Sequence, residues 1–322
     1  MHCDSRGLLL ALLLLFVPSL ALAQSYPTKP IRLVVPYPPG GGTDIIGRVV
    51  AQKLTDAFGQ QVVVDNRGGA GGVIGTEIVA RSLADGYTLL MAPTSHVINP
   101  SIYSRLPYDT AKDFAPITLA ASATIVLATH PSLPVKSVKE LIAHAKSKPG
   151  ELNFGSAGNG TVFHLAGELF KRQAGIDMVH VPFKGGGPTI AALAGGQISA
   201  AFETMLALSP HIKAGRVRGL AITSTQRSSV MPELPTTVEL GLPDIVADNW
   251  YGFYAPAGTP RPVIAKVNSE IVKSLKLPEV KERFQGLGTE VIGTTPEQLD
   301  VYVRKEMAKW SKTAREAGAR VE

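Results

Sequence analysis

The stretch IRLVVPYPPGGGTDIIGRVVAQKLTDAFG, residues 31–59, joins an apolar run to a helical pattern through three successive glycines. Ile46, Val49 and Leu54 share one face of that helix, and Gly59 can end it. The pattern predicts a buried strand, a glycine loop and an amphipathic helix, in that order. Glycines at such a junction let backbone come close to a ligand, and a phosphate, a dinucleotide and a carboxylate are the three candidates.

The alternation of strands and helices continues along the chain. Further strands are predicted at QVVVDNR, YTLLMAP, ATIVLATHPSLP, LNFG, DMVHVPF, ISAAFET, VRGLAIT and NWYGFYAPAG, with helical patterns between most of them. Such alternation predicts parallel sheets with crossover helices. The pattern forms two similar units followed by three helical stretches. We therefore expect an α/β protein of two lobes, each an open sheet with helices on both faces.

Two strands are expected to cross between the lobes, near residues 123–129 and 249–255. Lobe one then comprises residues 24–123 and 249–322, and lobe two comprises residues 124–248. A pair of crossing strands can act as a hinge, and a ligand is expected in the cleft between the lobes.

The N-terminal segment MHCDSRGLLLALLLLFVPSLALAQ has the order of features found in a secretory signal. Arg6 precedes a short apolar run, and the small-residue pattern Ala-Leu-Ala ends at Ala23. This predicts export with cleavage after Ala23 and a mature chain that begins at Gln24. The apolar run is shorter than the roughly 20 residues of a spanning helix. Cys3, the single cysteine, leaves with the signal, so no disulfide is expected.

The charge pattern argues against nucleic-acid binding. The chain has a formal net charge of +6, with Lys and Arg scattered rather than clustered. Basic runs with interleaved aromatic residues, which are typical of nucleic-acid binders, are absent from the sequence. The basic surface can at most attract small anions weakly from a distance.

Four predicted strand-to-helix junctions are rich in glycine: PGGGTD, RGGAGGVIG, GSAGNGT and KGGGPT. At the carboxyl ends of parallel strands, their helix N-termini can converge on one cleft and favour an anion there. A phosphate-binding loop is excluded because Arg48 and Val49 replace its lysine and hydroxyl residue. A dinucleotide fingerprint fails because Ile45 falls where its third glycine is required.

Catalytic and metal-binding motifs are also incomplete. FGSAG approaches the GxSxG pattern of hydrolases, but Phe154 replaces the first glycine, so Ser156 is interpreted as a hydrogen-bond donor. The histidines form no HxH or HExxH pair, so neither a metal nor a cofactor is expected. His164, in the first turn of its helix, is expected to pack or cap, with ligand contact left open.

A carboxylate remains as the expected ligand, and the charges beside the loops orient it. Asp44 would repel a carboxylate placed directly on its helix end, unless a water molecule or an amino group lay between them. The lobe-two loops carry Ser156, Asn159, Thr161 and Lys184 without an acid. We therefore expect the carboxylate to be held mainly by lobe two.

These residues resemble the substrate-binding proteins of tripartite tricarboxylate transporters, the Bug family of periplasmic receptors. The similar segments are YPTKPIRLVVPYPPGGGTD, DNRGGAGGVIG, DGYTLL, SAGNGTVFHLAGELF, HVPFKGGGPTIAALAGGQI and WYGFYAPAGTP. They occur in the family's order over almost the whole mature chain. The resemblance implies a type II periplasmic binding fold, with two sheets joined by a two-strand hinge. It also implies a small carboxylate ligand, delivery to membrane transporter subunits and no catalysis.

The resemblance also implies where the ligand binds. The family's first ligand loop, which holds the distal end of the ligand through water, corresponds to Tyr37, Pro38, Gly41, Gly42, Thr43 and Asp44. Its carboxylate site corresponds to Ser156, Gly158, Asn159, Gly160 and Thr161, with Phe183, Lys184 and Gly185 nearby. Ser95, in the expected loop PTSHVINP, either lines the cleft or caps a turn. Glu203 stands where the family has a shorter acid or a neutral residue, and a structural ion pair is preferred to amine recognition.

The resulting hypothesis is a monomeric periplasmic receptor that closes around a carboxylate and delivers it to a tripartite transporter. A receptor that serves a sensor kinase and an exported hydrolase or transferase are the alternatives. Which carboxylate binds, and with what affinity, does not follow from the sequence. We expect Thr161→Ala to weaken ligand binding with little loss of stability.

Overall fold

The computed structural model describes residues 26–320, and the expected signal peptide lies outside this range. The quoted stretch forms β1 (Ile31–Val35), a glycine loop and α2 (Gly42–Phe58), which ends at Gly59 in the left-handed conformation. The other lobe-one elements before the crossing are β2 (Val62–Asn66), η1 (Ala70–Gly72), α3 (Val73–Ala80), β3 (Thr88–Pro93) and α4 (Ser95–Ile102). The sequence prediction of a strand, loop and helix is thus confirmed.

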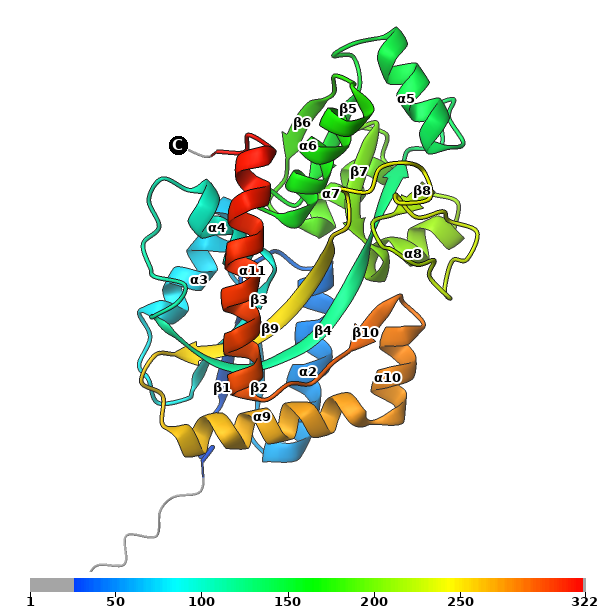
Figure 1. Ribbon diagram of the computed structural model, residues 1–322. Helices are drawn as coiled ribbons and strands as arrows, with labels where there is room; N and C mark the ends of the chain where they lie inside the picture. The colour runs from blue at the N-terminus through cyan, green and yellow to red at the C-terminus, as the bar shows by residue number, and fades with distance from the viewer. Residues whose placement is uncertain (1–25, 321–322) are drawn as a thin grey trace, which may run out of the picture.

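A long strand, β4 (Phe114–Thr129), then runs through both halves of the molecule (Figure 1). The elements that follow it in lobe two are α5 (Val138–Ser147), β5 (Asn153–Ser156), α6 (Val162–Ala174), β6 (Val179–Pro182), α7 (Gly186–Ala194), β7 (Ala200–Thr204), α8 (Met205–Lys213) and β8 (Arg218–Ile222). The chain returns to lobe one with β9 (Asp248–Pro256), α9 (Arg261–Lys276), α10 (Pro278–Gln285), β10 (Thr289–Val291) and α11 (Pro296–Glu316).

The strands form two sheets that share β4. In lobe one the order is β2-β1-β3-β9-β4-β10, and in lobe two it is β6-β5-β7-β4-β8. β1, β2 and β3 are parallel, as are β5, β6 and β7, whereas β4 and β9 run antiparallel to their neighbours. This arrangement confirms the expected α/β fold of two lobes.

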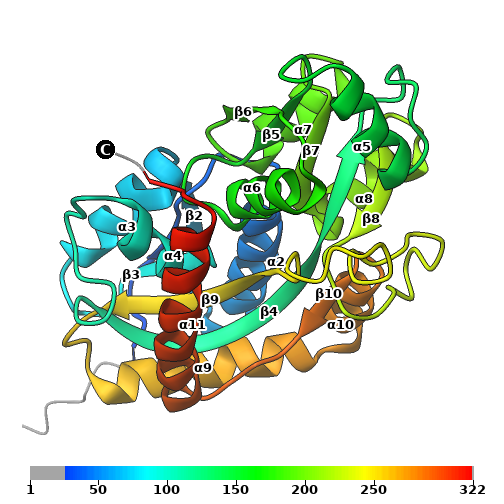
Figure 2. The ribbon, with the colours of Figure 1, turned by 45° about the horizontal axis from the view of Figure 1, so that its top comes forward.

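Alternate residues along the central strands of lobe one pack against opposite layers of helices. Leu33 and Leu89 belong to a core with α2 and α9, whereas Val34 and Leu90 belong to a core with α3, α4 and α11. The period of two follows from strand geometry, since successive side chains point to opposite faces. Both faces are therefore covered by helices, which leaves the loops at the carboxyl ends of the strands to face lobe two (Figure 2).

The crossing between the lobes differs in part from the expectation. β4 pairs with β9 up to Thr124 and with β7 from Ile125 onward, so one continuous strand makes the first crossing. β9 pairs only with lobe-one strands, so the second crossing precedes Asp248 and does not lie within residues 249–255. That second passage is not a strand; it is held beside β4 through Thr223, which donates to the Ile125 carbonyl oxygen and accepts from Ala247 N–H.

Besides the one-turn helix η1, two elements were absent from the sequence prediction. α4 occupies the expected loop PTSHVINP, and it contains Pro100. β10 adds a short antiparallel strand to the outer side of β4. α11 packs on α4 and β4, and its last turn reaches lobe two, where the Arg172 guanidinium donates to the Glu316 carbonyl oxygen at 2.5 Å (Figure 1).

Candidate functional site

A pocket lies between the two lobes at the carboxyl ends of the parallel strands. Its lobe-one wall comprises Tyr37, Gly41, Gly42, Thr43, Pro93, Ser95 and Asn249. Its lobe-two wall comprises Ala157, Thr161, Val162, Phe163, Gly186 and Glu203. A second, outer hollow continues from it between loop 69–71 and Tyr103 on one side and residues 157–159 and 182–184 on the other. We call the first of these the inner pocket and the second the outer hollow. Together they form the cleft.

Three helices begin at the inner pocket. The first residues of α2, α6 and α7 line it, namely Gly42, Val162 and Gly186. The first N–H groups of a helix have no partner within the helix, and the helix dipole places positive potential there. Gly41 and Gly185 provide no side-chain cap for α2 and α7. The pocket is therefore suited to an anion.

The glycines of the cleft also allow the lobes to touch. A Cβ added to Gly187 would lie 2.4 Å from the Pro39 carbonyl oxygen, and one added to Gly71 would lie 2.3 Å from the Asn159 carbonyl oxygen. A Cβ on Gly41 would lie 3.4 Å from the backbone of Gly186 in the other lobe. Backbone thus packs on backbone across the cleft. The glycines of PGGGTD therefore allow the two lobes to close on each other, in addition to any contact that they make with a ligand.

Tyr37 organises the lobe-one wall. Its hydroxyl donates to the Gly71 carbonyl oxygen at 2.8 Å and lies 2.8 Å from Ser95 Oγ. Burial raises the pKa of Tyr37, so the hydroxyl stays protonated and can donate. Ser95, the first residue of α4, is thereby fixed against the loop that follows β1.

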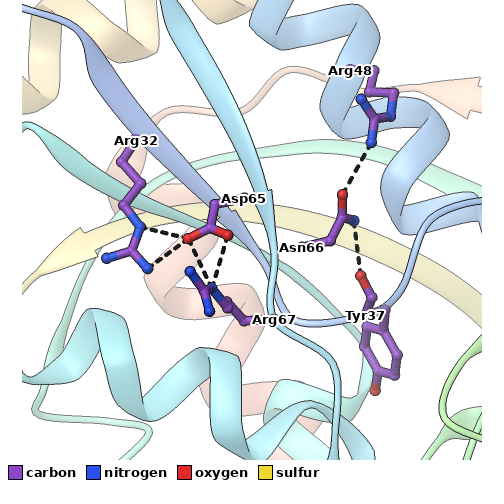
Figure 3. A network of polar contacts seen from close by, with 6 residues as sticks. All are labelled: Arg32, Tyr37, Arg48, Asp65, Asn66 and Arg67. Atoms are coloured by element: carbon purple, nitrogen blue, oxygen red, sulfur yellow. Dashed lines mark hydrogen bonds and ion pairs between the residues drawn. The ribbon is translucent and has the colours of Figure 1, made fainter.

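Behind this wall, Asn66 at the end of β2 fixes both the loop and the start of α2 (Figure 3). Its amide donates to the Tyr37 carbonyl oxygen at 2.9 Å and to Asp44 Oδ1 at 3.0 Å, and its Oδ1 accepts from Arg48 at 3.0 Å. Asp44 also pairs with Arg48 at 2.9 Å and accepts from Gly40 N–H at 3.1 Å. Asp44 is not among the residues that line the cleft, and a cation neutralises it.

The lobe-two loop is held by its own side chains. Ser156 is fully buried, and its Oγ lies 2.7 Å from His180 Nε2 and accepts from Gly158 N–H at 3.2 Å. Thr161 caps α6 by accepting from His164 N–H, and its hydroxyl donates to the Gly158 carbonyl oxygen at 2.7 Å. Ser156 therefore shapes the loop from behind, whereas Thr161 both caps a helix and faces the inner pocket.

The cap changes the expectation for Thr161→Ala. Losing an N-cap hydroxyl costs about 1 kcal/mol of stability, so the unfolding free energy should fall by that amount as affinity falls. Thr161→Ser keeps the hydroxyl and should restore most of the stability. Urea unfolding of both variants, followed by circular dichroism, measures the difference. Equal stability of the alanine and serine variants would contradict the capping role.

The Ser156–His180 pair is not arranged as a nucleophile and its base. Among the described residues, no carboxylate contacts His180, whose ring stacks on His164 with centroids 4.2 Å apart. Burial lowers the pKa of His180 to about 3 and that of His164 to about 4. A base with so low a pKa would hold a proton poorly at neutral pH. His164 is packed, as expected, and does not line the cleft.

Glu203, at the end of β7, lies at the base of the inner pocket and is 1% exposed. Its Oε2 accepts from the backbone N–H of Thr204 at 2.9 Å and from the Thr204 hydroxyl at 3.3 Å. No Lys, Arg or His in residues 26–320 forms a salt bridge with it. The expected structural ion pair is therefore wrong. Burial raises the pKa of Glu203 to about 7.

The sequence-predicted residues divide into two groups. Those that line the cleft are Tyr37, Gly41, Gly42, Thr43, Ser95, Gly158, Asn159, Thr161, Phe183 and Lys184. Those that do not line it are Pro38, Asp44, Ser156, Gly160 and Gly185. Gly185 and Pro38 meet across the lobes, since a Cβ on Gly185 would lie 2.8 Å from Pro38 Cδ. Asn249 and Tyr103 also line the cleft and were not predicted from sequence, whereas the loop 69–71 belongs to RGGAGGVIG, one of the glycine-rich junctions expected there.

The fold and the cleft define a class of protein: two-lobed binding proteins of the periplasmic type, which hold a solute between their lobes. A family model described as "Tripartite tricarboxylate transporter family receptor" matches residues 46–319. The chain belongs to this family. It is 39% identical to protein BugT of Bordetella pertussis, over 97% of this chain and 98% of that protein.

Solved structures agree with this assignment. The BugD periplasmic binding protein is 32% identical, with a TM-score of 0.89, and the comparison covers 92% of this chain and 100% of BugD. An R. palustris protein solved with adipate is 35% identical, with a TM-score of 0.89 over 92% of this chain and 100% of that one. MatC of Rhodopseudomonas palustris, solved with malate, is 30% identical, with a TM-score of 0.86 over 89% and 99% of the two chains. The chain is thus a member of a solute-binding receptor family.

One further observation concerns the membrane. In residues 26–320, no helix combines the length and the apolar character needed to cross a bilayer.

Proposed function

We propose that this protein is a periplasmic receptor that captures a small carboxylate between its lobes and delivers it to a tripartite membrane transporter. The observation that carries the proposal is the meeting of three helix N-termini at one pocket, without a lysine or arginine in its lining. Such N-termini bind anions through backbone N–H groups and the helix dipole. Adipate and malate, the ligands of two relatives, are of this chemical class.

In this proposal the ligand carboxylate is held chiefly by lobe two, at the first turns of α6 and α7. Thr161 supplies a hydroxyl, and Gly186 supplies a backbone N–H group at the start of α7. Lys184 adds positive charge at the outer hollow. Lobe one closes over the ligand with Tyr37, Thr43 and Ser95, directly or through water. A ligand that contacts both walls stabilises the closed state relative to the open state.

The proposal includes export, with the signal removed after Ala23, and release of the ligand unchanged. The absence of an exposed nucleophile at Ser156, which is fully buried, supports binding without chemistry. The family description supports a membrane transporter as the partner.

Thermal unfolding with a panel of solutes tests the proposal. Adipate, malate, monocarboxylates and aromatic carboxylates should include at least one that raises Tm, because a ligand that binds only the folded state stabilises it. Matched amides and amines serve as controls and should not raise Tm. Mass spectrometry of ligand recovered after binding should show an unchanged compound. Stabilisation by amines alone, or chemical conversion of the bound carboxylate, would contradict the proposal.

A further inference from the structure

The carboxyl group of Glu203 has one oxygen engaged and one free. Oε2 accepts both hydrogen bonds from Thr204, whereas Oε1 accepts none from the residues that the structure describes. Glu203 itself is 1% exposed and lines the inner pocket, and its Oε1 would lie 2.7 Å from a Cβ added to Gly186. An unpaired oxygen of a buried carboxyl group therefore faces the first turn of α7, where the ligand is proposed to bind.

Among residues 26–320, the groups around Glu203 supply no compensating positive side chain. The hydroxyls of Tyr37, in the loop after β1, and Tyr251, on β9, are the titratable groups that face it, and burial raises the pKa of both. α6 and α7 contribute only uncharged residues to the pocket lining, as does α2, whose Asp44 pairs with Arg48 outside the pocket. On β4, the residue paired with Glu203 is Val126. No positive side chain in the pocket lining offsets the desolvation of the ionised form of Glu203.

We propose that Glu203 takes part in ligand binding as a protonated acid, donating a hydrogen bond from Oε1 to an oxygen of the bound carboxylate, so that capture is accompanied by uptake of one proton wherever the ligand-free acid is ionised. The inference rests on the proposed function, because it requires a carboxylate in the inner pocket. The proton belongs on Oε1 because Oε2 already accepts from two donors. The hydrogen bond forms between Glu203 O–H and a ligand carboxylate, hydroxyl or carbonyl oxygen, and no covalent bond changes.

Two carboxyl groups that share one site cannot both be ionised easily, so a bound carboxylate raises the pKa of Glu203 above its ligand-free value. That ligand-free pKa is already raised to about 7 by burial. Below pH 7 the free protein holds the proton, and binding requires no uptake. Above pH 7 the free protein has lost the proton and must regain it on binding, so affinity falls as pH rises.

The same arrangement gives specificity. A protonated acid donates to an oxygen acceptor and offers no negative charge to an ammonium group. Ligands with an oxygen at this position are therefore favoured over amines in the pH range where Glu203 is protonated. Glu203 then distinguishes solutes by the atom that they place at the base of the pocket.

Calorimetric titration at pH 6 to 9 tests the inference, with adipate and malate as probes and any other carboxylate that raises Tm. In wild type, Kd should rise about tenfold for each pH unit above about 7, which is the slope for uptake of one proton. Glu203→Gln keeps an N–H donor and should bind with a Kd that varies less than threefold over this range. Glu151→Gln, an exposed acid on lobe two, is the matched control and should follow wild type.

The outcomes separate the two proposals. If carboxylates bind but wild type and Glu203→Gln share one pH profile, the role of Glu203 is overturned and the proposed function stands. Affinity for a carboxylate that rises with pH would overturn the proposal that Glu203 is protonated in the complex. Tighter binding of an amine to wild type than to Glu203→Gln would overturn it too. If no carboxylate binds either protein at any pH, the proposed function fails, and the inference fails with it. Repeating the titration in two buffers of different ionisation enthalpy counts the protons taken up directly.

Discussion

Gly187→Ala should weaken ligand binding by about 10- to 100-fold, because it prevents a close contact between the lobes. In the structure, where the two lobes touch, the new Cβ would lie 2.4 Å from the Pro39 carbonyl oxygen of the opposite lobe. Backbone must move to relieve such a contact, and overpacking of this kind costs about 1–3 kcal/mol. Gly187 lies in the first turn of α7 directly before Pro188, and a Cβ on the residue before a proline disfavours the helical conformation. Urea unfolding of the ligand-free variant measures any separate cost to stability.

Gly195→Ala is the matched control, because it makes the same substitution at the other end of α7. Its Cβ would meet only carbonyl oxygens of its own helix, the nearest at 3.2 Å. Calorimetry should show near-normal affinity for the control. Small-angle scattering with saturating ligand should show a more open Gly187→Ala variant. Normal affinity and normal compaction of that variant would show that the contact between α7 and the glycine loop is not needed for the ligand-bound state.

Much of the fold could be predicted because local pattern and final structure agree. β1 and the first part of β2 are rich in β-branched apolar residues, β3 is mostly apolar, and Gly59 ends the helix that follows β1. The first half of β4 was missed because Pro116, with alanines and a serine after it, makes a weak strand signal. Pairing with β9 holds that part of the strand, with register shifts beside Pro116 and Leu119. Such pairing is tertiary and cannot be read from a local window.

α4 was missed for a similar reason. It is only eight residues long, contains Pro100 and buries Ser95, His96 and Asn99 as well as its apolar residues, so its length and composition are not those of a typical helix. Its contacts with α11, from the far end of the chain, supply the packing that the sequence alone does not suggest. The short helix in turn positions Ser95 beside Tyr37.

For the candidate site, the sequence predicted which loops form the cleft, but it did not predict which side chains of those loops point into it. The glycine loops do meet in one cleft, yet Asp44 and Ser156 turn to partners outside it. Asp44 was expected to repel a carboxylate, and the position of Arg48 one helical turn later is the signal that could have predicted its neutralisation. Asn249 reaches the pocket only through the antiparallel pairing of β9 with β4, which connects distant parts of the chain.

Glu306 on α11 offers the largest expected effect on stability. The chain contains two tryptophans, and Glu306 Oε2 accepts from both indole groups, from Trp250 on β9 at 3.1 Å and from Trp310 at 2.8 Å. All three residues are buried. This carboxylate thus ties α11 to the central strands of lobe one, beside the passage of the chain between the lobes.

Glu306→Leu should lower the unfolding free energy by about 2–5 kcal/mol, because it leaves two buried indole N–H groups without an acceptor. Glu306→Gln is the matched control: its amide oxygen can accept from both indoles, so most of the stability should return. Urea unfolding followed by tryptophan fluorescence reports both effects, since each tryptophan in the chain contacts residue 306. Equal midpoints for the leucine and glutamine variants would mean that side-chain volume, and not the shared acceptor, holds α11 in place. A lower midpoint for leucine alone would show that one buried oxygen joins the C-terminal helix to the sheet.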